Sequence, residues 1–263
     1  MRDRDKIPNS YSQHRPNNLT TPKWMAGAES LQGLRPNNED RFLIDPGLSL
    51  FVVADGMGGH DAGEEASLLA IQAIHKLLKS DGSNRTGQAI LAEALDQANL
   101  AILEAAQSMG HRKMGTTIVL LAKVAGSWWI ANLGDSEAWL FRKGRRTILS
   151  QAHNMAAELV RQKAMAPKEA ALSPLKHRLV RYLGSMELKG AQSVFSDIRP
   201  FQPKAGDALL LGTDGLMDHV SEAKIRDGLG KGLDPQSLVQ ELTREALNHG
   251  SPDNATGLLV QFF

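Results

Sequence analysis

The chain has 263 residues, of which 42% are hydrophobic, and its 30 lysines and arginines nearly balance its 29 aspartates and glutamates. This length and apolar content suffice for one large core or two modest ones. The near-neutral charge gives no reason to expect nucleic acid or an anionic membrane as a partner. The chain has no cysteine, which excludes disulfides and thiolate metal sites and favours a cytoplasmic location.

Residues 1–24, MRDRDKIPNSYSQHRPNNLTTPKW, are polar and rich in proline and asparagine. They lack the apolar core of a signal peptide, and no apolar run in the chain approaches the ~18 residues that a membrane span needs. We expect them to form a polar N-terminal arm. No repeat or linker divides the rest, so residues 25–263 are predicted to form a single domain. We expect a monomer that does not associate with membranes.

Strands and helices are both predicted from the hydrophobic pattern. Residues 48–54, LSLFVVA, have the β-branched, apolar composition of a buried strand. Apolar residues recur at helical spacing over 63–80 and 87–109. Residues 116–149 are predicted to form a meander of four strands with turns at KVAGS, LGDS and RKGR. Further strands are expected at 207–213 and 255–263.

Residues 151–186 are helical in propensity, but Pro167 and Pro174 interrupt them, so we expect a flap inserted between two strands. Short turns require antiparallel neighbours, and strands that are apolar on both faces need cover on both sides. The predicted fold is therefore α+β: a central antiparallel β-sandwich flanked by α-helices on both sides (α-β-β-α), with an inserted flap.

Acidic residues stand at the ends of these predicted strands. A lone aspartate before a glycine is usually a turn residue. A set of buried carboxylates instead repels itself and loses hydration, which hard cations such as Mg²⁺ or Mn²⁺ would offset. A carboxylate that bridges two such ions is the usual arrangement for hydrolysing phosphate esters. The residues in question are Glu39, Asp40, Asp55, Asp135, Asp214 and Asp253.

Six segments occur in the order typical of the metal-dependent protein phosphatases, the type 2C serine/threonine phosphatases. They are RPNNEDRF, VVADGMGGHDAGEEAS, MGTTIVLL, ANLGDSEAWLFR, LLLGTDGLMD and SPDNATGLLV. The chain resembles this family from about residue 26 to its C-terminus, and its DGMGG segment and short loops are similar to those of bacterial members. The resemblance implies the same sandwich fold and a metal-dependent serine/threonine phosphoprotein phosphatase.

The resemblance also implies a ligand set for two Mg²⁺ or Mn²⁺ ions and a third, weaker one. Asp55 would bridge the first two ions, and the carbonyl of Gly56 would bind the first. Asp214 and Asp253 would hold the second ion, and Asp135 with Asp214 would hold the third. Glu39 and Asp40 correspond to the acidic pair that holds metal-bound waters.

Arg35 corresponds to the arginine that pairs with the substrate phosphate, for which its planar fork is suited. The resemblance implies attack on phosphorus by a water or hydroxide that bridges two ions. His60 is the candidate general acid for the leaving group, and His153 is a weaker one. Three residues separate His60 from the Asp-Gly pair that the histidine directly follows in the family's best-known form, so a loop histidine that bonds a carboxylate remains the alternative.

One position departs from the family pattern. LSQAHN, residues 149–154, stands where the family usually has an Asp-His pair, and Ala152 replaces that aspartate. We therefore expect altered hydrogen bonds at the start of the flap and an unaltered metal site.

Two other functions remain open. One is a catalytically silent binding or sensor protein with the phosphatase fold, which is disfavoured because such chains usually lose metal ligands. The other is a metal-dependent hydrolase of nucleotides or other small phosphate esters. Under the main interpretation the partners are phosphorylated Ser/Thr proteins, including a cognate bacterial Ser/Thr kinase and its targets.

Overall fold

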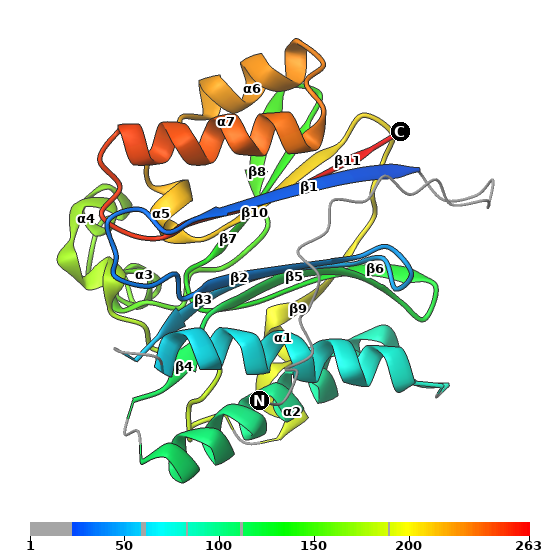
Figure 1. The fold of residues 1–263 in the computed structure, drawn as a ribbon, viewed down its shortest axis with the longest axis vertical. Helices are drawn as coiled ribbons and strands as arrows, with labels where there is room; N and C mark the ends of the chain where they lie inside the picture. The colour runs from blue at the N-terminus through cyan, green and yellow to red at the C-terminus, as the bar shows by residue number, and fades with distance from the viewer. Residues whose placement is uncertain (1–22, 59–61, 83, 111–112, 189) are drawn as a thin grey trace.

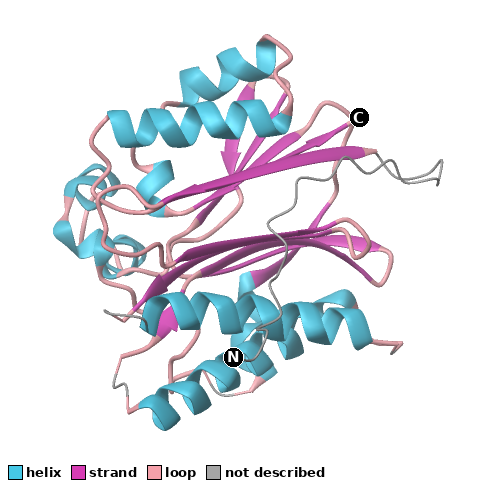
Figure 2. Cartoon of the chain, viewed as in Figure 1, coloured by secondary structure: helices cyan, strands magenta, loops and turns pink. Residues whose placement is uncertain are grey.

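The structure is a computed structural model, and it describes residues 23–58, 62–82, 84–110, 113–188 and 190–263. Residues 1–22 of the predicted arm and His60 lie outside the described residues. Two antiparallel sheets face each other, and helices cover the outer face of each (Figures 1 and 2). The predicted α-β-β-α sandwich is confirmed.

The first sheet has the strand order β1-β11-β10-β7-β8 and is covered by α6 and α7 (Figure 1). Its strands are β1 (Trp24–Leu31), β7 (Glu137–Arg142), β8 (Arg145–Ile148), β10 (Ala208–Gly212) and β11 (Ala255–Phe262). The covering helices are α6 (Glu222–Gly230) and α7 (Pro235–Asn248). β1, α6 and α7 were not predicted from the hydrophobic pattern. Because β1 begins at Trp24, which is buried, the folded domain starts one residue before the predicted boundary.

The second sheet has the order β2-β3-β5-β6-β9, and the short β4 pairs with β3. Its strands are β2 (Asp40–Asp45), β3 (Leu50–Met57), β4 (Gly115–Thr116), β5 (Ile118–Val124), β6 (Ser127–Leu133) and β9 (Ile198–Phe201). The predicted helices are present as α1 (Ala62–Ser80) and α2 (Gly87–Met109), which cover this sheet (Figure 1). None of the helices in the described ranges has both the length and the hydropathy needed to cross a bilayer.

The predicted four-stranded meander over 116–149 is wrong at its centre. β5 and β6 form a hairpin in the second sheet, whereas β7 and β8 form one in the first, so the chain changes sheets at residues 134–136. Gly134 has a φ of 103°, and a Cβ there would lie 2.6 Å from the Cβ of Thr117. The LGDS segment thus has the composition of a hairpin turn, but it carries the chain across the sandwich.

Aromatic side chains fill the space between the two sheets. Phe51 lies 4.8 Å from Trp24 and 6.3 Å from Trp128, measured between ring centroids, and Trp128 lies 5.4 Å from Phe262. In β3, Phe51 and Val53 belong to this inner cluster, whereas the alternate residues pack against the helical layer. Both faces of β3 are therefore buried, which explains its unbroken apolar run.

The predicted flap lies beside one end of the sandwich, on the left in Figure 1. It contains α3 (Met155–Arg161), α4 (Pro167–Leu172) and a 3₁₀ turn (Pro174–His177). Each proline occupies the first turn of its helix, where no intrahelical N–H bond is lost, so the prolines divide the flap into short helices. Two more short segments follow: a 3₁₀ helix (Ala191–Asp197) and α5 (Asp214–Met217).

A glycine allows α7 to start against β1. A Cβ on Gly27 would lie 2.4 Å from the backbone N of Gln236, whose side chain exchanges two hydrogen bonds with the backbone of Ala28. We predict that Gly27→Ala lowers the free energy of unfolding by about 1–3 kcal/mol through overpacking, measured by urea denaturation. Gly82→Ala is the matched control, because a Cβ at Gly82 meets nothing within 4 Å. Equal midpoints for the two variants would contradict this packing.

Candidate metal centre

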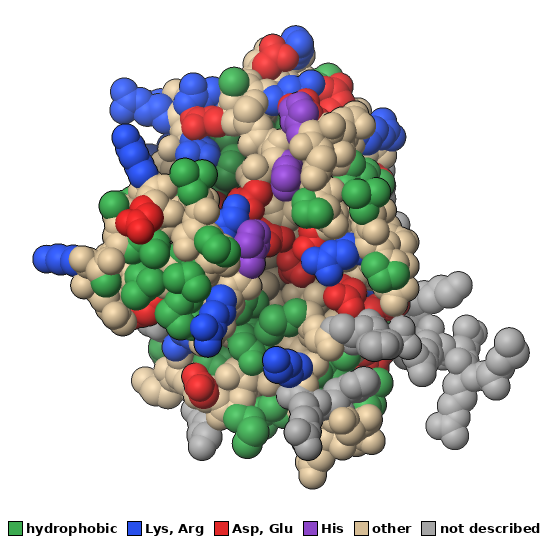
Figure 3. All heavy atoms as spheres, turned by 90° about the vertical axis from the view of Figure 1, so that its left-hand side faces the viewer, with side chains coloured by type: hydrophobic (Ala, Val, Ile, Leu, Met, Phe, Trp, Pro, Cys, Tyr) green, Lys and Arg blue, Asp and Glu red, His purple; other side chains and the backbone are tan. Residues whose placement is uncertain are grey.

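The predicted acidic residues lie together at one end of the sandwich, around a cavity of about 800 Å³. Figure 3 shows acidic side chains grouped near the middle of this face, with basic and histidine side chains beside them. Five of the six predicted carboxylates line the cavity: Glu39, Asp55, Asp135, Asp214 and Asp253. Asp40 lies beneath them and is 2% exposed. The sandwich therefore brings together carboxylates from five separate places in the chain.

The pairing of β2 with β3 places Asp40 directly opposite Asp55. Like charges in this arrangement repel each other. Burial raises the pKa of Asp40 to about 7, and the charges of Asp214 and Asp253 add to this, while hydrogen bonds from hydroxyl groups oppose it. One such bond runs from Thr213 Oγ1 to Asp40 Oδ2, at 3.0 Å. Burial and the charge of Asp40 hold the pKa of Asp55 well above its ordinary value.

Asp135 lies in the segment in which the chain crosses from one sheet to the other, and Asp214 lies just after β10. Burial, followed by the charge of Asp214, raises the pKa of Asp135 to about 7. Asp214 opens α5, and its pKa is raised by burial and by the charge of Asp253. His177, from the flap, lies 3.5 Å from Asp214, measured from Nδ1 to Oδ2. This histidine was not predicted, and nothing in its sequence context marks it.

Two glycines at this end are required by backbone packing. A Cβ on Gly56 would lie 2.0 Å from the carbonyl O of Gly63, and a Cβ on Gly63 would lie 2.6 Å from Cδ of Glu39. The start of α1 thus packs directly on the end of β3, and the Glu39 carboxylate lies over it. The N–H of Gly56 also donates to the Glu39 carbonyl at 3.2 Å. Close approach of α1 is therefore a reason for small residues here.

Arg35 lines the cavity, and its Nη2 lies 2.6 Å from Asp253 Oδ2. Its loop is held by hydrogen bonds from Gln32 Nε2 to the carbonyls of Arg35 and Pro36, each 2.8 Å long. Asn254 fastens the same loop by donating to the carbonyls of Gln32 and Asn37, and its Oδ1 accepts from the N–H of Glu39. Asn254 is a supporting residue that the sequence analysis missed, although it directly follows the predicted Asp253.

The donor set fits a hard divalent cation, because it consists of oxygens and because several of these buried carboxylates repel one another. In the described part of the chain, no three His, Asp or Glu side chains are close enough together to form a metal-binding group. The carboxylates surround the cavity without meeting at one point. Two of them already contact nitrogen groups of the protein, Asp253 through Arg35 and Asp214 through His177.

His153 does not lie in this cavity, so its prediction as a second general acid is wrong. The side chain is buried, and its Nδ1 accepts a hydrogen bond of 3.3 Å from the N–H of Gly134. Because a backbone N–H can only donate, the ring proton lies on Nε2, which faces Asp197 Oδ1 at 3.1 Å. The ring therefore holds backbone and a carboxylate together. The preferred candidate, His60, lies outside the described residues.

A model of the protein phosphatase 2C family matches residues 32–262. The chain belongs to this family. It is 32% identical over 235 residues to serine/threonine phosphatase stp of Listeria monocytogenes, a match that covers 87% of this chain and 91% of the relative. The predicted family and the predicted function, a metal-dependent serine/threonine protein phosphatase, are confirmed.

Solved structures agree in fold. The serine/threonine phosphatase PstP/Ppp of Mycobacterium tuberculosis superimposes with a TM-score of 0.80 at 31% identity, covering 90% of this chain and 98% of that one. The catalytic domain of the phosphatase PstP in complex with two manganese ions gives a TM-score of 0.77 at 30% identity, covering 91% and 98%. Both superpositions thus cover about nine-tenths of this chain.

Stability without metal should fall as pH rises. The pKa values of Asp40 and Asp135 are about 7 in the folded chain, above their ordinary 3.8, so between these values the folded chain binds more protons than the unfolded one. This contribution is complete below about pH 4 and is lost as pH rises through 7. In chelator, the midpoint of thermal unfolding should be lower at pH 8 than at pH 5. Asp40→Asn should flatten the profile, and a midpoint that rises steadily to pH 8 would contradict the shifted pKa values.

Proposed function

We propose that this cavity is the active site, in which two divalent ions and Arg35 act on phosphoserine and phosphothreonine in proteins. One observation carries the proposal: two buried carboxylates, Asp40 and Asp55, lie opposite each other on the paired strands β2 and β3, close to the charge of Asp214. Burial and repulsion make such a cluster costly unless multivalent cations neutralise it. Metal binding is therefore the role that explains why the fold brings these charges together.

The position of each residue supports the ligand role that we propose for it. Asp55 stands at the centre of the cluster, where the charges of its neighbours act on it from several sides, and we assign it the bridging position. Asp214 and Asp253 line the cavity and would hold the second ion, and the Gly56 carbonyl would contribute to the first. Asp135 would share a third ion with Asp214; burial, and then the charge of Asp214, raises the pKa of Asp135.

Glu39 and Asp40 would hold water at the metal centre. Asp40 is too deeply buried to reach substrate, and it is fixed by the hydroxyl of Thr213. When bound, Mn²⁺ or Mg²⁺ would lower the pKa of a water and neutralise charge on the transferring phosphoryl group. We infer that Mn²⁺ serves at least as well as Mg²⁺, because Mg²⁺ demands nearly ideal octahedral geometry.

Arg35 is the substrate-binding residue of this site. It is half exposed at the cavity and belongs to a loop that Gln32 and Asn254 hold rigid. Its fork is suited to two oxygens of a phosphate monoester, and its charge offsets that of the transferring group. His60 remains the candidate for donating a proton to the serine or threonine oxygen that leaves.

Flap residues also line the cavity of about 800 Å³ that contains Arg35, among them His177, Arg178 and Tyr182. A phosphoprotein substrate would contact this wall with the residues that flank its phosphate, whereas a small phosphate ester would reach only the inner carboxylates and Arg35. We propose that the substrates include a bacterial Ser/Thr kinase and its targets, within a cytoplasmic signalling system.

Turnover should require a divalent cation. We predict that a phosphoserine peptide is hydrolysed with Mn²⁺ or Mg²⁺ and that excess chelator abolishes the reaction.

Asp214→Asn should lose activity by about 100-fold or more while its fold, checked by circular dichroism, is unchanged. The same variant should gain less thermal stability from Mn²⁺ than the unchanged chain, since stabilisation follows binding. Full activity in chelator, or a normal rate for Asp214→Asn, would remove the metal assignment.

Arg35→Ala should weaken substrate binding and leave metal binding intact. Loss of a charge-assisted, two-point contact should raise KM for the phosphoester about tenfold or more. Calorimetry should show Mn²⁺ binding as tight as in the unchanged chain or tighter, because Arg35 no longer competes for Asp253. Arg35→Lys is the matched control that keeps the charge but not the fork. Lost Mn²⁺ binding in Arg35→Ala would show that the arginine is structural.

A further inference from the structure

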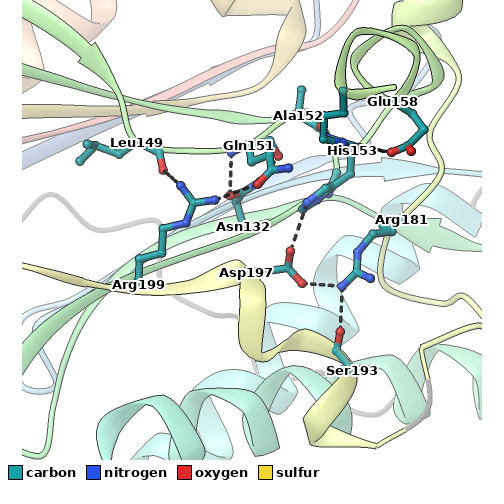
Figure 4. A network of polar contacts seen from close by, with 12 residues as sticks. Asn132, Leu149, Gln151, Ala152, His153, Glu158, Arg181, Ser193, Asp197 and Arg199 are labelled. Atoms are coloured by element: carbon teal, nitrogen blue, oxygen red, sulfur yellow. Dashed lines mark hydrogen bonds and ion pairs between the residues drawn. The ribbon is translucent and has the colours of Figure 1, made fainter. Parts of the chain in front are cut away.

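A buried polar cluster lies behind the cavity and takes no part in the chemistry above. Its centre is Asp197, the last residue of the 3₁₀ helix, with a side chain that is 6% exposed. His153 contacts one carboxylate oxygen of Asp197 and Arg181 contacts the other (Figure 4). Arg181 also donates to the carbonyl of Ser193 at 2.8 Å. The carboxylate thus joins two residues that stand 28 positions apart, at the two ends of the flap.

These two residues form the base of the flap. The His153 carbonyl accepts from the N–H of Val180 at 2.9 Å, and the N–H of Met155 donates to the carbonyl of Arg178 at 2.8 Å. Residues 153–155 and 178–181 therefore run side by side, joined by backbone bonds. Beyond this base, α3 packs mainly on α4 and on the 174–177 turn, within the flap itself. The direction in which the flap leaves the sandwich depends strongly on what fixes its base.

His153 also ties the base of the flap to the turn at residues 134–136. Its N–H donates to the carbonyl of Gly134 at 2.9 Å, while its Nδ1 accepts from the N–H of Gly134. With its ring proton on Nε2 and facing Asp197, the imidazole joins that carboxylate to the flap base. The backbone bond from His153 to Gly134 does not depend on the charge of Asp197, so the turn itself stays in place without it.

Replacement of the family's usual aspartate by Ala152 leaves this linkage in place. The Ala152 carbonyl accepts from Arg161 at 3.1 Å, and Arg161 also pairs with Glu158. On the other side, Gln151 and Asn132 exchange two hydrogen bonds, and Arg199 reaches Gln151 (Figure 4). These contacts hold the chain at the start of the flap, where altered hydrogen bonds are expected.

We propose that Asp197 is a positioning residue that, through His153 and Arg181, sets the flap wall at residues 177–182 for a phosphoprotein substrate. The proposal rests on the proposed function, because it assigns this wall to substrate binding. Asp197 itself does not line the cavity. Its effect should therefore appear with substrates large enough to touch the flap, and much less with those that reach only the inner site.

The test compares two substrates across two variants. Asp197→Asn keeps the shape of the side chain but removes the charge that faces Arg181. Asp45→Asn is the matched control, because Asp45 forms a second His–Asp pair, with His75 at 2.7 Å, at the opposite end of β2 from Asp40. At saturating Mn²⁺, Asp197→Asn should raise KM for a phosphoserine peptide about five- to tenfold, but change turnover of p-nitrophenyl phosphate by about twofold at most. Asp45→Asn should change neither.

A second measurement needs neither metal nor activity. In chelator, amide hydrogen exchange at residues 177–182 should be about tenfold faster in Asp197→Asn, while β5 and β10 keep their protection. If Asp197→Asn does not fold, Arg181→Lys replaces it, since lysine keeps the charge but cannot reach both Asp197 and Ser193 in the same way. Arg181→Lys should also speed amide hydrogen exchange at residues 177–182, but by less than Asp197→Asn.

Equal loss for both substrates, a similar effect of Asp45→Asn, or unchanged flap exchange would overturn the proposal. Failure of the proposed function would look different. In that case the unchanged chain would hydrolyse neither substrate with Mn²⁺, and the exchange measurement would still decide whether Asp197 holds the flap.

Discussion

The repulsion between Asp40 and Asp55 is the constraint on which the rest of the site depends. The two residues are paired across β2 and β3, and the register cannot shift to separate them. A slip by one residue would turn Phe51 and Val53 out of the inter-sheet core. The residues of β3 that pack against the helices would then point into that core. The hydrophobic core therefore holds the two carboxylates together against their own charge, and a metal centre turns that enforced proximity into a binding site.

Much of the surrounding structure moderates this cost without removing it. The Thr213 hydroxyl bonds Asp40, the start of α1 packs directly on β3 through Gly56 and Gly63, and Asn254 fixes the loop that carries Arg35. None of these groups carries a positive charge. Arg35 carries a positive charge and pairs with Asp253, where a substrate phosphate would also bind. The inner carboxylates are thus left for ions that come from solution.

The sequence was informative where structure is local. The strand at 48–54, the two long helices and the aspartates at strand ends follow from short-range patterns, and these located Asp55, Asp135, Asp214 and Asp253 correctly around one cavity. Errors occurred where the outcome depends on distant partners. β1 has small residues because α7 lies on Gly27, which no local pattern reports. The turn at 134–136 has the residues of a hairpin but joins two sheets, and its direction follows from packing against Thr117.

Side-chain partners were harder still to predict than elements. Arg35 and Asp253 stand 218 positions apart in the chain, and His153 and Asp197 also come from separate segments, so neither pairing leaves a periodic signal. His153 was a reasonable candidate for acid catalysis by residue type, yet its two ring nitrogens are both engaged by a neighbouring backbone and a buried carboxylate. Residue type indicates what chemistry a side chain can perform, and only its partners decide whether it performs that chemistry or holds other residues in place. Under the proposed function, the inner carboxylates belong to the first group, and the cluster around Asp197 belongs to the second.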